Sequence, residues 1–502
     1  MGISYYKRSD TTPSVSSVTY SATRFNGIDA YNDERALSLN TATYAHNVEF
    51  VGGTLMQASG ISSPTYTDEN GTVCAIPNVG VAGEKSISTT LFRKYDYDND
   101  VEDYRIVTLL SDGAFYECSL GDDTFTEIPG IRQVEESGMM LNYYMDSNDI
   151  LILVTTKGVY KWTGSSLITY ADSPKLSTAC LHYERLFGVD AIDTNTIRFS
   201  NALNPFDWDT TTGNAGYISL MDEGGEIQRL VSFQGSIYVF REFAIHRLTA
   251  YADPSDYSIT KIYETDCNIQ PKSICIAGDT MMFMADKRLY TFDGYTVTEV
   301  QSTLTALIEN ADNAVGGYYK NRYYLSCKIA PQDDWGVLDE AYGSMTNNAL
   351  IAIDMSTGDY SITRGIDVLS FAQLAGNNLN VVMLTFANDE SCGNYGMLDT
   401  SGKFFDRDMP IVWQGPTSHM DYIDRYKVVR RLYITTLYGV DVTIKMDDTT
   451  KVIHINGSTK PQCVPMVMVG YTMSVKLSTE TEKMYISNFK FECDVIRSYY
   501  AN

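Results

Sequence analysis

Short runs of β-branched and aromatic residues, separated by turns of Asn, Asp, Pro and Gly, dominate the middle of the chain. The clearest example lies between Leu181 and Tyr251, where four such runs follow one another. Runs of this length, bounded by these turn residues, are typical of antiparallel strands. The composition agrees, because 37 Tyr and 19 Phe residues accompany abundant Thr, Val and Ile, which favour strands. An all-β protein is therefore predicted.

The strand pattern repeats between residues 74 and 409. Polar turns closed by Gly follow several of the strands, and recurrence at roughly 40 to 45 residues is typical of four-stranded propeller blades. We predict an irregular β-propeller of six or seven degenerate blades over 74–409. A β-sandwich array would give similar strand spacing and is the alternative. The strand endings, at offsets of 44, 39, 47, 44, 63 and 44 residues, are Phe115-Tyr116, Val159-Tyr160, Arg198-Phe199, Ile245-His246, Leu289-Tyr290, Ala352-Ile353 and Gly396-Met397.

The longest offset in this repeat indicates a blade with an insertion. Residues 301–313 carry a helical pattern, and residues 331–348 form a long polar loop. Long loops inside a compact domain are usually functional. The 331–348 loop and the acidic 96–103 loop are therefore the predicted contacts with neighbouring molecules or with a lumen.

After Pro410 the strands become longer and one face of each becomes polar. Between Phe489 and Val495 apolar and polar residues alternate, which indicates one buried face and one solvated face. We predict a β-sandwich-like platform domain over residues 410–502. Residues 1–73, with a helical pattern from Asp33 to about Tyr44, are expected to pack on this platform or to close the propeller.

The formal net charge is −25, from 63 acidic and 38 basic residues. A protein that holds nucleic acid needs a basic footprint that neutralises phosphates, and no segment concentrates Lys and Arg. A DNA-binding function is therefore excluded. The acidity either aids solubility or has a functional use, and the sequence leaves both open.

Nine scattered cysteines, none of them in a CxxC pair, indicate free thiols and assembly in a reducing compartment. The N-terminus lacks the apolar core of a signal peptide. No apolar run reaches the roughly 18 residues that a membrane-spanning helix needs. Cytoplasmic assembly is the resulting expectation.

Catalytic and metal-binding motifs are absent from the sequence. The five histidines are far apart, with no HxxxH or HxH pair. Alternating Asp96, Asp98 and Asp100 resemble a Ca²⁺ loop, but valine occupies both positions where an EF-hand needs Gly and Glu. We favour the acidic tip of a hairpin, with a weak cation site as the alternative. No cofactor and no catalytic residue is predicted.

Two elements resemble proteins of the tail nozzle or tail hub group of tailed bacteriophages, which includes tail tubular protein B-like and phage stabilisation protein-like members. The first is an F-x-G-I-D element near the N-terminus. The second is a block with an R-L-F strand, an N-P-x-D-W turn, a Gly-Gly pair and a further Gly. The matching residues are Phe25, Gly27, Asp29, Arg185, Leu186, Phe187, Asn201, Asn204, Pro205, Trp208, Gly225 and Gly235.

This resemblance implies a structural virion protein in which a propeller stands beside a platform built by both chain ends. It further implies a ring, a homo-hexamer, at the distal end of the tail. Head-to-tail adaptor or portal-side proteins and tail fibres or spikes are the implied partners. An acidic lumen would repel phosphate, so double-stranded DNA would pass through during ejection without binding.

Two other functions stay open. A propeller that binds a host receptor or carbohydrate for adsorption would show exposed Trp and Tyr side chains clustered on one face. A polysaccharide-degrading enzyme would need two carboxylates across a sugar cleft, and acidic residues are too plentiful here to nominate a pair. Trp208 and Trp335 are the candidate sugar platforms, although packing is the expected role of Trp208.

Overall fold

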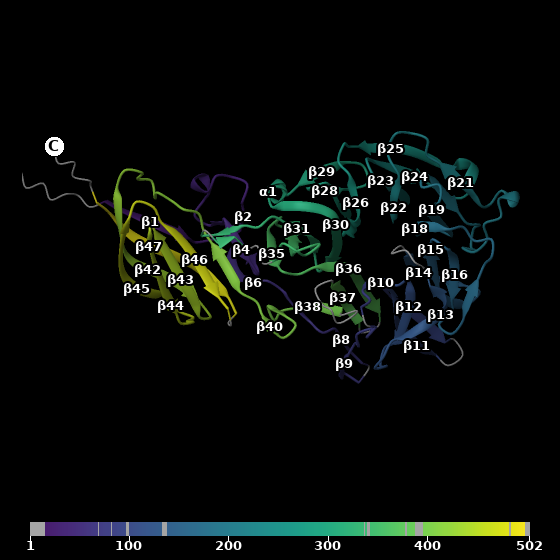
Figure 1. Ribbon diagram of the computed structural model, residues 1–502, viewed down its shortest axis with the longest axis horizontal. Helices are drawn as coiled ribbons and strands as arrows, with labels where there is room; N and C mark the ends of the chain where they lie inside the picture. The colour runs from purple at the N-terminus through teal and green to yellow at the C-terminus, as the bar shows by residue number, and fades with distance from the viewer. Residues whose placement is uncertain are drawn as a thin grey trace, which may run out of the picture.

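The computed structural model describes residues 16–496 except 69, 82, 97–99, 133–137, 336, 339–341, 377–378, 387–394 and 481–482. A propeller occupies one end of the elongated molecule and a sandwich the other (Figure 1). Strands make up almost all of the regular structure. The short helical turns are η1 (Glu34–Ala36), η2 (Thr210–Thr212), η3 (Pro254–Asp256) and α1 (Ser302–Thr305).

The propeller has seven blades, each built on a four-stranded antiparallel sheet. The first strands of the blades lie next to one another around the axis, and β36 of the last blade contacts β10 of the first. Blades one to three are β10 (Ser86–Asp96), β11 (Val101–Leu110), β12 (Ala114–Ser119), β13 (Thr126–Arg132); β14 (Gly138–Met145), β15 (Asn148–Thr155), β16 (Gly158–Trp162), β17 (Leu167–Thr169); and β18 (Leu176–His182), β19 (Arg185–Asp190), β20 (Thr196–Phe199), β21 (Gly216–Ser219).

The remaining blades continue the same up-and-down order. They are β22 (Ile227–Phe233), β23 (Ser236–Arg241), β24 (Ala244–Thr249), β25 (Ser258–Glu264); β26 (Ile269–Ala277), β27 (Thr280–Ala285), β28 (Arg288–Phe292), β29 (Val297–Val300); β30 (Ile308–Tyr319), β31 (Arg322–Ile329), β34 (Ala349–Asp354), β35 (Tyr360–Arg364); and β36 (Val368–Gly376), β37 (Leu379–Phe386), β38 (Tyr395–Asp399), β7 (Gly60–Ser62).

The seventh blade closes the ring with a strand from the other end of the chain. The N-terminal strand β7 pairs antiparallel with β38, so that Gly60 lies opposite Asp399 and Ser62 opposite Met397. The hairpin β39 (Lys403–Phe404) and β40 (Arg407–Asp408) extends this sheet beyond β7. A second hairpin, β8 (Thr65–Thr67) and β9 (Val73–Ala75), lies between β7 and β10 in the chain. Opening the ring requires these backbone hydrogen bonds to break.

Two sheets that pack face to face form the sandwich. Phe489 of one sheet meets Trp413 of the other with ring centroids 5.7 Å apart, and both side chains are almost fully buried. The first sheet is β45 (Gln462–Gly470), β42 (Tyr426–Thr436), β47 (Tyr485–Ile496), β6 (Thr54–Gln57) and β5 (Val48–Val51), with β1 (Ser16–Ala22) also on β47; the second is β4 (Tyr44–His46), β41 (Ile411–Gln414), β46 (Ser474–Thr479), β43 (Val440–Met446) and β44 (Thr449–Ile455). Both chain ends therefore build the sandwich.

The sandwich is attached to the sixth blade through a continuous core and direct polar contacts, which we call the sandwich–propeller joint. The backbone N–H of Asn47 donates to Ile362 O at 2.8 Å. Arg322 and Glu49 form an ion pair at 2.5 Å, with the two side chains 23% and 13% exposed. Because these contacts are largely buried, they hold the two parts more firmly than a surface ion pair would.

The fold class predicted from sequence, an irregular propeller with a sandwich-like platform, is confirmed, and the blade number is seven. The predicted insertion lies in the sixth blade, between β31 and β34, and contains the hairpin β32 (Asp333–Asp334) and β33 (Val337–Leu338). All seven aligned strand endings fall in the third strand of a blade, namely β12, β16, β20, β24, β28, β34 and β38. The repeat therefore identified the same strand in every blade.

Both helical patterns were wrong. Only Ser302–Thr305 is helical in the 301–313 segment, because β30 starts at Ile308. Register shifts in the pairing of β30 with β31 give buried residues at a spacing of three, such as Ile308 and Ala311, which imitates a helix. The 33–44 segment holds the single turn η1 and then β3 (Thr41–Ala42), which pairs with β2 (Asn26–Ile28).

Candidate functional site

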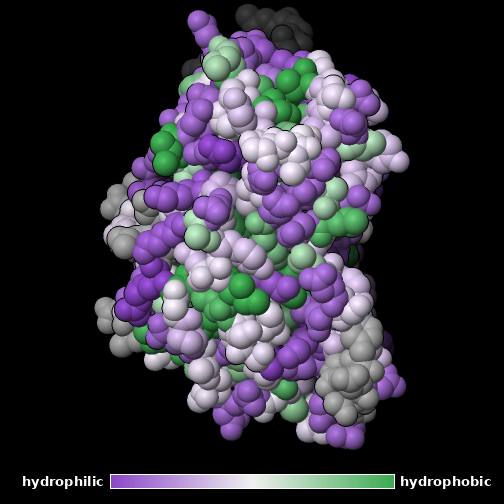
Figure 2. All heavy atoms as spheres, turned by 90° about the vertical axis from the view of Figure 1, so that its right-hand side faces the viewer, coloured by the Kyte–Doolittle hydropathy of each residue, from purple (hydrophilic) through white to green (hydrophobic). Residues whose placement is uncertain are grey.

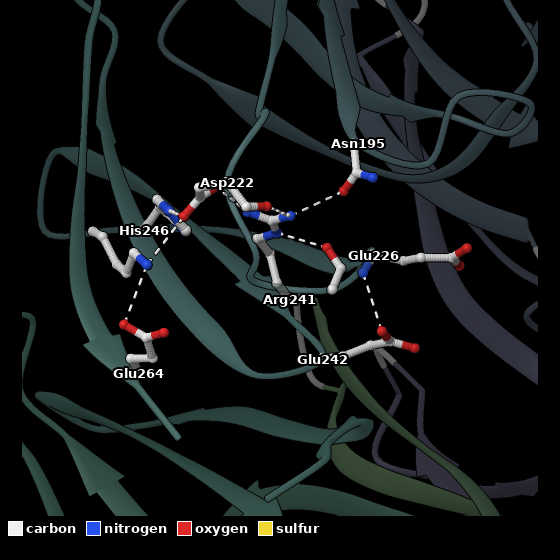
Figure 3. A network of polar contacts seen from close by, with 9 residues as sticks. Asn195, Asp222, Glu226, Arg241, Glu242, His246 and Glu264 are labelled. Atoms are coloured by element: carbon white, nitrogen blue, oxygen red, sulfur yellow. Dashed lines mark hydrogen bonds and ion pairs between the residues drawn. The ribbon is translucent and has the colours of Figure 1, made fainter. Parts of the chain in front are cut away.

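A buried arginine joins the third and fourth blades at the centre of a polar network (Figure 3). Arg241 ends β23 and is 1% exposed. Its Nε donates to Gly225 O at 2.8 Å, and its Nη2 donates to Asp222 O and to Asn195 Oδ1, both at 3.1 Å. Its Nη1 forms an ion pair with the Asp222 carboxylate. The guanidinium therefore fixes the connection between β21 and β22 against both blades.

Asp222 receives further contacts from the fourth blade. Its Oδ2 lies 3.2 Å from His246 Nε2 on β24 and 3.2 Å from Lys261 Nζ on β25. Burial acts to raise the pKa of Asp222, but hydrogen bonds from Lys261 and Arg241 outweigh it and lower the pKa to about 2. Burial lowers the pKa of His246. The cluster is thus a neutral histidine and an ionised aspartate between two cations, which is a structural arrangement.

The Gly-Gly pair of the sequence motif is explained by this network. A Cβ on Gly224 would lie 2.8 Å from Cζ of Arg241, and one on Gly225 would lie 2.5 Å from the Glu242 carboxylate. Gly225 also has φ +79°, in the left-handed region that favours glycine. The motif therefore lets the backbone pass close over Arg241. Sequence inspection missed Arg241 and Asp222, because nothing local distinguishes them from surface charges.

The R-L-F part of the motif lies in β19 of the third blade. Leu186 and Phe187 are fully buried core residues. Arg185 is 7% exposed, and its Nη1 donates to Ser200 O at 2.9 Å and also to Asn214 O. These residues support the blade, and none of them faces an open cleft.

The N-P-x-D-W part of the motif forms a tight loop after β20. Asn201 Nδ2 donates to Asp207 Oδ2 at 2.9 Å, and Asn204 Oδ1 accepts the Phe206 N–H at 3.1 Å. Pro205 is buried. Trp208 packs against the core shared by the second and third blades, so its ring is not free to stack on a sugar.

The last glycine of the motif, Gly235, closes the turn between β22 and β23 with φ +74°. A Cβ there would lie 3.3 Å from the hydroxyl of Tyr183 in the third blade. Tyr183 is 58% exposed and meets Tyr251, which is 68% exposed, with ring centroids 5.3 Å apart. In the fifth blade Tyr295 is 72% exposed and lies under the Arg247 guanidinium at 5.6 Å. Exposed tyrosines therefore occur on turns of three neighbouring blades.

The F-x-G-I-D element lies at the sandwich–propeller joint. Phe25 is 2% exposed and meets Trp413 edge-on at 5.2 Å. The Tyr360 hydroxyl of the sixth blade donates to Ile28 O at 2.9 Å. Hydrogen bonds from Asn32 and Tyr31 outweigh burial and lower the pKa of Asp29. A Cβ on Gly27 would meet only Asp359 Oδ1, at an ordinary 3.7 Å.

The proposed cation site falls largely outside the described residues. Asp98 and the side chain of Asp96 lie there, and Asp100 accepts a hydrogen bond from the Tyr95 hydroxyl. Strands β10 and β11 flank this segment and pair antiparallel, so the two strands form the hairpin expected from sequence. Among the described residues, no group of three His, Cys, Asp or Glu side chains is placed to hold a metal ion.

The described part of the 331–348 loop folds back on the sandwich. The ammonium groups of Lys445 and Lys476 lie over the Trp335 ring, 5.8 and 6.0 Å from its centroid. Gln332 accepts a hydrogen bond from Arg364 of the sixth blade. The Trp335 ring therefore contacts the sandwich of the same chain, so it is a less suitable surface for stacking a sugar.

Eight of the nine cysteines are free thiols, and the ninth, Cys392, lies outside the described residues. Burial raises the pKa of several of these thiols, to about 12 for Cys180 and Cys327.

In the described part of the chain no helix has the length and hydrophobicity needed to cross a bilayer. Figure 2 shows the side of the propeller farthest from the sandwich, where small hydrophobic groups are set among hydrophilic ones.

No family model and no curated protein sequence matches this chain. Among solved structures it is similar to PorZ of Porphyromonas gingivalis, with 12% identity and TM-score 0.38 over 69% of this chain and 44% of that one, so it spans less than half of PorZ. BBS1N, in a complex with ARL6DN, is 8% identical, with TM-score 0.39, over 68% of this chain and 99% of that one. The Neurospora crassa Pan2 WD40 domain is 10% identical, with TM-score 0.36, over 65% of this chain and 98% of that domain.

Proposed function

We propose that this chain is a structural subunit of a tailed-phage virion, which forms the ring-shaped nozzle or hub at the distal end of the tail. The observation that carries the proposal is the architecture of the two chain ends. β1 pairs with β47 from Ser16 opposite Val495 to Ala22 opposite Phe489, and both ends build the platform beside the propeller. The resemblance in the F-x-G-I-D element and the 181–248 block implies this same arrangement.

The two matched elements support a structural role in a second way. Phe25 packs in the core of the sandwich–propeller joint, and Gly225 belongs to the connection held by Arg241. Residues of this kind preserve the relative positions of blades and platform. A subunit that must keep its shape while DNA is retained and then ejected needs such fixed joints.

We place the contact between copies on the outer face of the six-stranded sheet. Its edge strand β45 leaves Val467 and Val469 exposed at 64% and 48%, beside a groove of about 810 Å³ that Arg430 and Glu492 line. An exposed apolar edge strand is a template for pairing with another chain. The adaptor or portal-side proteins and the tail fibres or spikes would then bind other faces of the ring.

The first test is the mass of the purified protein, alone and mixed with tails that lack it, followed by negative-stain imaging. Rings, or a monomer that becomes a ring at the tail end, are expected. Val467→Asp should abolish the ring, whereas Val452→Asp, on the edge strand β44 of the other sheet and 61% exposed, should not. A monomer that ignores tails in every variant contradicts the proposal.

Adsorption to the host is the second candidate, and the exposed tyrosines favour it. Turns that follow the first and third strands of a blade lie at the same end, because neighbouring strands run antiparallel. Tyr183 follows a first strand, and Tyr251 and Tyr295 follow third strands, so they share one propeller face. A monomer that binds host envelope polysaccharide, and loses binding in Tyr251→Ala, would favour this function over the nozzle.

A further inference from the structure

A cavity is formed by the innermost strands of four neighbouring blades. Its volume is about 300 Å³, and its lining comes from the innermost strands β22, β26, β30 and β36. Val231, Ile274, Ile276 and Phe371 give it apolar walls. A concave, mostly apolar site with a few polar groups is the usual form of a small-molecule site.

One cation, Arg229 of β22, enters this cavity. Its Nη1 donates to Pro271 O and to Ile274 O, both at 2.8 Å. Both carbonyls belong to a stretch of β26 where the register with β27 shifts, between Gln270 and Cys275. A single nitrogen of the arginine thus donates to both carbonyls of the irregular strand. The Nε and Nη2 donors are left for another acceptor.

That other acceptor is not supplied by the described residues. Within them Arg229 takes part in no ion pair, and its Nε and Nη2 form no hydrogen bond to protein. Burial lowers the pKa of the guanidinium, although an arginine stays protonated. The guanidinium is partly buried and has no counter-charge among the described residues, so it would attract an anion that reaches it. Arg241 shows the contrast, since a buried arginine in the neighbouring joint is paired with Asp222.

Two glycines on β30 let the neighbouring strands approach its backbone closely beside this cation. A Cβ on Gly316 would lie 2.3 Å from Ser273 O, and one on Gly317 would lie 2.4 Å from Cγ of Phe371. The Phe371 ring therefore packs directly on the glycine backbone and presents an aromatic wall. The amide of Gln373, an exposed residue, is at the same wall and adds a polar group.

We propose that this cavity binds a small organic anion, whose carboxylate or phosphate group accepts hydrogen bonds from Arg229 and whose apolar body packs against Phe371. Arginine presents a planar fork of donors that matches both groups. A cationic ligand is disfavoured because Arg229, the one charged residue in the lining, is positive. The net charge of −25 repels anions elsewhere, so binding depends on this single residue.

Isothermal titration calorimetry of the full chain at low salt tests this proposal, with benzoate and phenyl phosphate as probes and neutral benzyl alcohol as their control. At least one anion should bind in a one-to-one ratio, and the neutral probe should not. Whichever anion binds more tightly shows whether the site prefers a carboxylate or a phosphate group. Arg229→Met should weaken binding by at least about tenfold. Lys272→Gln should leave it unchanged, because Lys272 of β26 is an exposed cation that does not line the cavity.

Gln373→Trp is a second variant, which fills the cavity while it leaves Arg229 and its two carbonyl acceptors in place. It tests anion binding even if Arg229→Met fails to fold. Bound anion should also slow alkylation of Cys275, a lining thiol whose pKa burial raises to about 11. Peptide mapping would use Cys463, an exposed cysteine far away in the sandwich, as the internal reference. Anion binding that survives both variants, equal binding of benzyl alcohol, or no binding of either anion overturns the proposal.

Discussion

Acid should weaken the sandwich–propeller joint through one histidine. His46 of β4 is 3% exposed, and its Nδ1 accepts the backbone N–H of Arg364 at 3.3 Å. Its Nε2 is buried and has no partner among the described residues. Burial, with the nearby positive charge of Arg364, lowers the pKa of His46 to about 3. The ring is therefore neutral in the folded protein near pH 7.

The sign and size of the effect follow from linkage. The pKa of an unfolded histidine is about 6.5, so the unfolded chain takes up the proton first as the pH falls. The contribution of His46 to stability is complete above pH 6.5 and is lost progressively down to the folded pKa of about 3. Each pH unit in this window removes roughly 1.4 kcal/mol, which gives about 2.7 kcal/mol between pH 7 and pH 4.5.

Denaturant unfolding at pH 7.0 and pH 4.5 measures this loss as a difference between variants. His46→Gln keeps an acceptor for the Arg364 N–H but cannot titrate, so it should lose about 2.7 kcal/mol less than the wild type over this interval. His182 and His246, whose pKa values burial also lowers, titrate in both proteins and cancel. The control is His454→Gln, since that ring is 59% exposed. Equal pH dependence in the wild type and His46→Gln would refute the reasoning.

Substitutions at three further buried positions, Gly224, Phe25 and Ile61, test other contacts. Gly224→Ala should lower the stability by about 2 kcal/mol in thermal unfolding, because its Cβ meets Arg241, whereas Gly27→Ala should be tolerated. Phe25→Ala should cost about 3 to 5 kcal/mol, and Phe25→Leu should recover part of this loss. Ile61→Asp buries a carboxylate in the closing strand of the propeller, so proteolysis near residues 60–64 should become at least about tenfold faster. Unchanged cleavage there would show that β7 does not secure the seventh blade.

The repeat of the blades could be found from sequence because each blade reuses the same local chemistry. An aromatic or β-branched third strand marks every blade, and in most blades a Gly turn follows it. The partners of distant strands carry no such signal, so the pairing of β1 with β47, and of β7 with β38, could only be expected in outline. The predicted helix at 301–313 failed because bulges in β30 change the spacing of its buried residues.

The polar clusters were beyond sequence analysis for a related reason. Arg229 bonds to carbonyls 42 and 45 residues away, and these acceptors exist only because β26 is irregular at that point. Arg241 likewise finds Asn195 and Asp222 through the packing of two blades. A side chain whose partners are backbone groups of another blade leaves no motif. The family-like glycines were the visible part of such a cluster, since their role is to make room for Arg241.

The positions of the arginines bear on the use of the acidity. Arg105 donates to Gly164 O between the first and second blades. Arg241 joins the third and fourth blades, and Arg229 joins the fourth and fifth. Arg322 pairs with Glu49 of the sandwich, and the Arg364 guanidinium lies over the ring of Tyr44 in β4. Arg105, Arg241 and Arg322 are paired with carboxylates, so each of these contacts uses an acid together with a base. The excess of 63 acidic over 38 basic residues therefore lies mainly outside these joints. A ring of such subunits would present a field that repels phosphate from any face that lines its lumen. Solubility is served by acidic side chains anywhere on the surface, whereas the proposed nozzle needs them on the face that lines the lumen.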